Sequence, residues 1–234
     1  MKFISSITIF ILLLSSCANI VAPTGGDKDV NTPKLLSTLD AESMKHVHTK
    51  IITFEFDEFI VLNNWEENFY ISPPIAKRIQ KDIKGKILTL TLEDTLALNT
   101  TYFIDLNNCI KDLNEGNVLD TLDYIFSTSD ELDTLTISGK LQDAYTLESI
   151  ENAWVMLFEE SKNDTIIFKE NPDYIAKTNK EGYFNFPNLN SKNYKIVALT
   201  DFDFIYNTEE KIAFNDTIIN AETDSFISLL AFDP

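Results

Sequence analysis

The feature that most constrains the fold of this chain is a period-two alternation of apolar and polar residues. Residues 52–56 read Ile-Thr-Phe-Glu-Phe, and residues 88–92 read Leu-Thr-Leu-Thr-Leu. Because successive side chains of a strand point to opposite faces, each pattern predicts a strand with one buried face. Similar stretches predict strands at 101–106, 122–128, 135–141, 153–159, 183–186, 194–199 and 226–230.

The spacing of these segments predicts the fold class. Strands that recur about every 8–15 residues, with polar turns between them, favour antiparallel β-sandwiches over βαβ units. No amphipathic helix pattern of ten residues interrupts them. Glycine is scarce, so asparagine, which tolerates the left-handed conformation, is expected at turns. The candidates are Asn63, Asn64, Asn99, Asn114, Asn117, Asn179 and Asn193. We therefore expect an all-β chain of two antiparallel β-sandwich domains, divided near residues 129–134.

The N-terminus carries the pattern of an export signal. Lys2 precedes an apolar run over residues 3–14, which is too short to span a bilayer as a helix. Leu14-Ser15-Ser16-Cys17 then resembles the lipobox of bacterial lipoproteins. The resemblance implies a signal peptide over residues 1–16 and lipid attachment at Cys17; an ordinary cleavage site beside a chance cysteine is the alternative. Residues 17–33 lack a periodic pattern and are expected to form a flexible tether.

The charge excludes several partners. With 19 basic and 37 acidic residues, the net charge is −18, which repels nucleic acid and anionic lipid surfaces. Membrane attachment must therefore come from acyl chains on Cys17. We expect an outer-membrane lipoprotein of the cell envelope that binds no nucleic acid. Cys109 then has no partner cysteine and is expected to be a buried apolar residue.

Two groups of segments resemble known modules. The first group is similar to a bacterial Ig-like domain of the SbsA type, and its segments are Ile51–Glu58, Lys86–Leu90, Leu96–Tyr102, Asp112–Asn117 and Tyr124–Thr128. This resemblance implies a seven-stranded sandwich over residues 34–130 that serves as a spacer or interaction module and has no catalytic residues.

The second group resembles a carboxypeptidase-regulatory-like domain. Its segments are Ile137–Leu141, Ala153–Val155, Thr178–Phe186 and Asn193-Tyr194. The resemblance implies a small transthyretin-like (prealbumin-like) β-sandwich over residues 135–234. Asn193 departs from the glycine usual in that family. The combination of a lipobox, a tether and two sandwiches resembles a group of envelope lipoproteins of unknown function.

The sequence offers little support for catalysis. His46 and His48 could present two imidazoles from one face of a strand, but no cysteine or further histidine joins them. No nucleophile motif accompanies either histidine. Acidic pairs such as Asp57-Glu58 are expected on solvated strand edges. We expect no enzyme and no cofactor.

One loop has the ligand pattern of a calcium site. Asp201 and Asp203, followed by Asn207 and Glu209, place oxygen ligands in a loop after a strand, as hard cations prefer. Bulky Phe204 replaces the small residues that a tight calcium loop needs. A solvated acidic loop is therefore the alternative.

Five Asp-Thr-aliphatic triplets recur along the chain and resemble acceptor sites of a bacterial O-glycosylation system. Their threonines are Thr95, Thr121, Thr134, Thr165 and Thr217. The alternative is local: aspartate favours a turn and threonine the strand that follows.

The function expected from these observations is non-catalytic. We expect a membrane-anchored envelope lipoprotein that serves as a structural or protein-interaction module and contacts other envelope proteins or glycans. The alternative is a carbohydrate- or peptide-binding accessory lipoprotein of an outer-membrane complex. Trp65 near Phe69 and Tyr70 could form a sugar platform in that case, although the sandwich core is favoured over a surface position for most of these rings.

Overall fold

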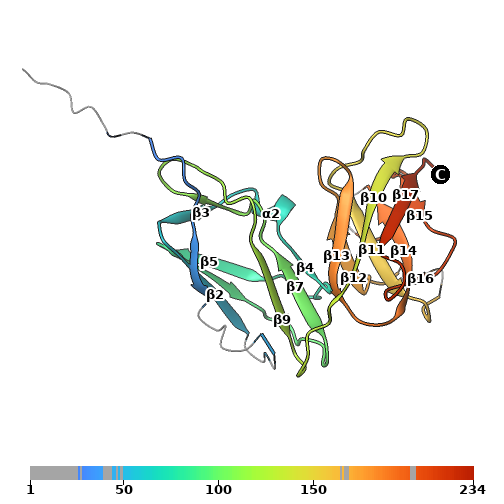
Figure 1. Cartoon of the computed structure of the whole chain (residues 1–234), viewed down its shortest axis with the longest axis horizontal. Helices are drawn as coiled ribbons and strands as arrows, with labels where there is room; N and C mark the ends of the chain where they lie inside the picture. The colour runs from blue at the N-terminus through green and yellow to red at the C-terminus, as the bar shows by residue number, and fades with distance from the viewer. Residues whose placement is uncertain are drawn as a thin grey trace, which may run out of the picture. The chain divides into compact units, whose positions relative to one another are not determined.

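The computed structural model describes residues 26, 28–38, 44–45, 47, 50–163, 165, 169–200 and 204–234. The chain divides into two units, Met1–Val30 and Asn31–Pro234. Among the residues that the structure describes, the helices and strands lie in the second unit (Figure 1).

Antiparallel sheets make up the first half of this unit. Its elements are β1 (Leu35–Thr38), β2 (Ile51–Phe56), β3 (Ile60–Leu62), α2 (Trp65–Asn68), β4 (Tyr70–Ser72), β5 (Gln80–Lys84), β6 (Ile87–Thr91), β7 (Thr101–Asp105), β8 (Ile110–Asp112) and β9 (Asp123–Ser127). One sheet has the order β1-β2-β6-β5, a second β4-β7-β9, and β3 pairs with β8. The four long strands expected in this half from period-two alternation are all present.

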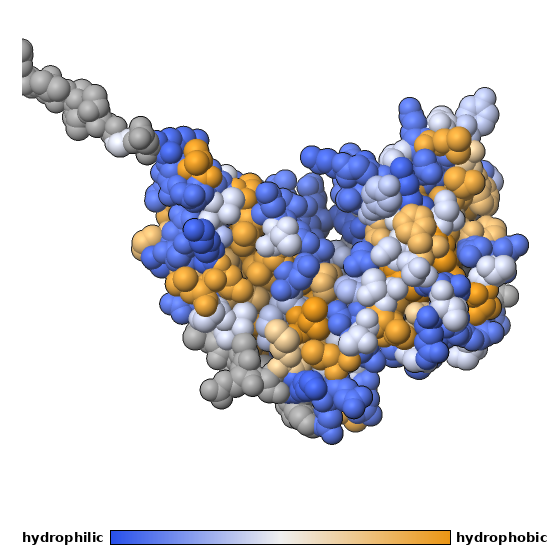
Figure 2. Space-filling view, in the orientation of Figure 1, coloured by the Kyte–Doolittle hydropathy of each residue, from blue (hydrophilic) through white to orange (hydrophobic). Residues whose placement is uncertain are grey.

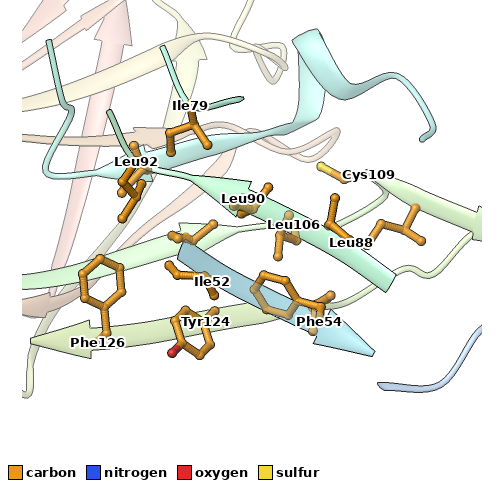
Figure 3. Packing of buried hydrophobic residues seen from close by; sticks show 14 of the residues in the cluster. Ile52, Phe54, Ile79, Leu88, Leu90, Leu92, Leu106, Cys109, Tyr124 and Phe126 are labelled. Atoms are coloured by element: carbon orange, nitrogen blue, oxygen red, sulfur yellow. The ribbon is translucent and has the colours of Figure 1, made fainter. Parts of the chain in front are cut away.

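A single apolar cluster fills the space between these strands. Phe54 of β2, Leu88 and Leu90 of β6, and Phe126 of β9 are all fully buried. In Figure 3 the labelled side chains from these strands point toward one another. Cys109 lies in the same cluster, and burial raises the pKa of its thiol to about 12, so its expected role as a buried apolar residue is confirmed.

The second half is also built from sheets. Its strands are β10 (Leu135–Asp143), β11 (Trp154–Glu159), β12 (Tyr174–Lys177), β13 (Tyr183–Leu189), β14 (Asn193–Leu199), β15 (Ile212–Phe214), β16 (Ile219–Asn220) and β17 (Phe226–Ala231). The orders are β13-β10-β17 and β12-β11-β14-β15, and β16 also pairs with β14.

One strand pair departs from the antiparallel expectation. β17 runs parallel to β10, and the two lie side by side in Figure 1. A parallel pair needs a long crossover. Here β11 to β16 supply that connection: the chain passes through the other sheet, adds β13 beside β10, and enters the other sheet again before it returns as β17.

β11 is buried on both of its faces. Val155 and Leu157 point into the cluster shared with β10 and β13, whereas Met156 and Phe158 belong to a smaller cluster on the opposite face. Trp154 packs half-buried against this smaller cluster. The period-two pattern separates the two faces of a strand but does not tell which face meets the larger core.

Asparagine occupies five of the nine positive-φ positions among the described residues. Asn64 and Asn99 adopt positive φ angles, as expected, and Asn108, Asn152 and Asn188 do the same. Asn193 was expected in a turn, but it is the first residue of β14, so that prediction is wrong.

Candidate functional site: an asparagine-lined cleft

A polar cleft lies where the loops of the first half meet those of the second. Its volume is about 670 Å³, and a volume of this size lies within the ordinary range for small-molecule sites. The walls include seven asparagines, which are Asn63, Asn64, Asn68, Asn107, Asn108, Asn152 and Asn179. A hollow bordered largely by hydrophilic residues is visible between the two halves in Figure 2.

A row of three polar side chains crosses the β4-β7-β9 sheet at one end of this cleft. Tyr70 of β4 lies opposite Asp105 of β7, which in turn lies opposite Asp123 of β9. Like charges in directly opposed positions destabilise a sheet unless they are compensated. Asn107 compensates part of this repulsion, because its backbone N–H donates to Asp105 (2.8 Å) and its Nδ2 donates to Asp123 (3.1 Å).

The same row has shifted pKa values. Burial raises the pKa of Asp105 to about 6, and desolvation also raises the pKa of Asp123. Burial, with the neighbouring charge of Asp105, raises the pKa of the Tyr70 hydroxyl well above its usual value. Desolvation by burial is therefore the largest cause of the raised pKa values of Tyr70, Asp105 and Asp123.

Three contacts join the two halves beside the row. The backbone N–H of Ile175 donates to Ser72 Oγ at 3.0 Å, and both residues are buried. Lys177 Nζ donates to the backbone carbonyl of Glu67. The Tyr70 ring packs edge-on against Trp154, with ring centroids 5.7 Å apart. β4 and β12, both at the edge of a sheet, thus cover each other, which protects two edges that would otherwise be exposed.

These pKa directions predict a pH-dependent stability. Asp105 has a native pKa of about 6 against about 3.9 in an unfolded chain. The native state therefore binds this proton more tightly, and the contribution of Asp105 is fully present below about pH 4 and lost as the pH rises through about 6. Tyr70, Asp123 and Lys177 face the group. Burial raises the pKa values of the Tyr70 hydroxyl and the Asp123 carboxyl, and it lowers the pKa of the Lys177 amine.

Asp105→Asn keeps an acceptor for the Asn107 N–H and removes the titration. We expect its melting temperature at pH 8 to exceed that of the unmodified protein, and its loss of stability between pH 4 and 8 to be smaller. Thermal unfolding across this pH range measures both, with Asp216→Asn at an exposed position as the control. If the melting temperatures of Asp105→Asn and of the unmodified protein changed identically with pH, the pKa of Asp105 would be the same in the folded and unfolded states.

Several residues singled out from the sequence lie outside the described residues. These are Cys17, His46, His48, Asp201 and Asp203. Lipid attachment and the imidazole pair therefore stay predictions. Within the described ranges, no helix is both long and apolar enough to cross a membrane.

The described part of the candidate calcium loop is held by its own hydrogen bonds. The backbone N–H of Asn207 donates to Glu210 at 2.8 Å, and that of Glu209 donates to Asn207 Oδ1 at 2.9 Å. Among the residues that the structure describes, no group of three histidine, cysteine or acidic side chains is placed to hold a metal. The calcium site stays a prediction, because Asp201 and Asp203 are not among those residues.

The other candidates are placed clearly. All five triplet threonines, Thr95, Thr121, Thr134, Thr165 and Thr217, are exposed. Exposure is required of a glycosylation acceptor and is equally expected at a turn, so both interpretations stay open.

Trp65 does not form a surface platform. It is buried at 7% exposure in the first core and stacks on Phe69 with centroids 4.3 Å apart. The α2 turn carries it inward, where burial of a large aromatic surface stabilises the fold. Only Tyr70 of the three candidate platform rings lines the cleft.

Comparison with known proteins supports the fold of the first half. Residues 29–128 match the family of bacterial Ig-like domains. No curated protein matches the sequence.

Among solved structures, the chain is similar to the N-terminal part of the bacterial S-layer protein SbsC, at 14% identity over 81% of this chain and 44% of that one, with a TM-score of 0.29. It is also similar to BcpA, the major pilin subunit of Bacillus cereus, at 9% identity over 82% of this chain and 67% of that one, with a TM-score of 0.29. The pilus 2b backbone protein of group B streptococcus gives 10% identity over 86% of this chain and 97% of that one, with a TM-score of 0.26. The chain thus spans less than half the length of the SbsC fragment. Residues 29–128 thus resemble a bacterial Ig-like domain, and the residues that the structure describes fold almost entirely into β-strands.

Proposed function

We propose that this chain is a non-catalytic lipoprotein of the bacterial cell envelope, anchored to the outer membrane through acylated Cys17, that serves as a structural or protein-interaction module. The observation that carries the proposal is the bacterial Ig-like domain directly behind a segment with an export signal and a lipobox. The net charge of −18 supports acyl chains rather than a basic surface as the means of attachment. The partners are other envelope proteins or glycans.

The arrangement nearest to a catalytic pair is Asp105 and Asp123. Shifted pKa values in a cleft are a recognised sign of an active site, but structural networks shift them as well. Both carboxylates accept hydrogen bonds from Asn107. We assign them a structural role in the row across the sheet.

Membrane fractionation tests the proposed anchor. We expect Cys17→Ala to move the protein from the membrane pellet to the soluble fraction, because the remaining polypeptide has no other affinity for lipid. Cys109→Ala is the matched control: that cysteine is buried in the core, so the variant should stay in the pellet. If the Cys17→Ala protein remains in the pellet after a high-salt wash, without a bound partner, the proposal that acyl chains on Cys17 anchor the protein is wrong.

A second candidate function, an accessory subunit that binds carbohydrate or peptide, is favoured by one observation, the amide-lined cleft.

A further inference from the structure

We infer that the cleft is a binding site for a neutral oligosaccharide. The inference goes beyond the structural role proposed above and rests on the side chains of the described residues that meet at the cleft.

Three asparagines from separate turns supply the polar groups. Asn64 lies between β3 and α2, Asn108 between β7 and β8, and Asn152 between β10 and β11. All three have positive φ angles, of 39°, 57° and 59°. Each is exposed, and none of the three side-chain amides has a hydrogen-bond partner among the residues that the structure describes. Left-handed turns alone explain asparagine at each position, but they do not explain why three such turns, far apart in the chain, line one cleft.

The turns that carry these amides are held in place. Asn63 Nδ2 and Asn68 Nδ2 both donate to the backbone carbonyl of Asn108, at 2.9 and 3.0 Å. The Asn152 N–H donates to the carbonyl of Thr178 at 2.9 Å. Fixed turns present the free amides without a large ordering cost on binding, which favours recognition of a polar ligand.

The chemistry of the walls favours hydroxyl groups. A side-chain amide donates two hydrogen bonds and accepts two, and a hydroxyl group also both donates and accepts. Five acidic residues line the cleft against two lysines, Lys177 and Lys180. This excess of negative charge disfavours anionic sugars and phosphates.

A peptide fits these walls less well. Peptide recognition uses apolar pockets for anchoring side chains, and the lining offers only Val118 and the ring of Tyr70. A neutral sugar needs no such pocket, because its hydroxyl groups can exchange hydrogen bonds with side-chain amides.

Glycan binding tests the inference directly. The full chain carrying Cys17→Ala is applied to an array of neutral and sialylated oligosaccharides, with lysine-rich and neutral peptides as further probes, and affinity for the best ligand is measured by calorimetry. We expect a neutral oligosaccharide to bind. The triple variant N64G/N108G/N152G should weaken binding about tenfold or more, as the loss of three hydrogen bonds implies. Glycine keeps the positive φ angles, so the turns remain.

Asn99→Gly is the matched control, since Asn99 also has a positive φ angle (51°) and does not line the cleft. It should bind as the unmodified protein does. Binding of peptides only, binding of no neutral glycan on the array, or equal affinity in the triple variant would each overturn the inference. The mass of the bound glycan is checked after incubation, because cleavage would contradict the non-catalytic function while leaving the binding site intact.

Discussion

Leu90→Ala is expected to destabilise the native fold by about 2–5 kcal/mol. Leu90 is fully buried on β6, and β2 and β5 flank this strand on either side. Figure 3 shows its side chain within the labelled cluster. Truncation removes the transfer free energy of the lost methyl groups and leaves a cavity that paired strands on both sides cannot close.

Urea unfolding measures this loss. Leu98→Ala removes the same atoms from a side chain that is 78% exposed, and its effect should stay within about 0.5 kcal/mol of zero. Equal losses in the two variants would mean that Leu90 does not lie in the core.

Gly139→Ala is expected to destabilise the second half by about 3 kcal/mol or more through overpacking. Gly139 is the point on β10 where β13 and β17 both pair, opposite Phe184 on one side and Ile227 on the other. An added Cβ would lie 2.2 Å from the carbonyl oxygen of Ile227 and 2.2 Å from the tip of the Phe184 ring. The ring can move, but the backbone carbonyl belongs to the parallel ladder and cannot move without breaking it.

Gly26→Ala is the control, because nothing lies within 4 Å of the Cβ that it would add. Circular dichroism melting compares the two variants. An unchanged melting temperature for Gly139→Ala would show that β17 does not pair closely with β10 in solution.

Strands with a clear alternation of five residues or more were predictable. Residues 52–56 and 88–92 match β2 and β6 closely, because half-buried strands need apolar residues on one face only. The short strands were not predictable. β3, β8 and β15 have three residues each, too few for a pattern, and they form because partner strands lie beside them.

The features of the candidate site also fall into two groups, those that the sequence predicts and those that it does not. Alternation, charge and the asparagine turns are local, so the sequence by itself determined an all-β fold, an acidic surface and left-handed turns at Asn64 and Asn99. Only the tertiary structure decided that Trp65 turns inward and that β17 pairs in parallel with β10. It also decided that the turns at Asn64, Asn108 and Asn152 line one cleft. The reason is physical: long-range pairing brings these segments together, and no local pattern records which distant residues a turn will face.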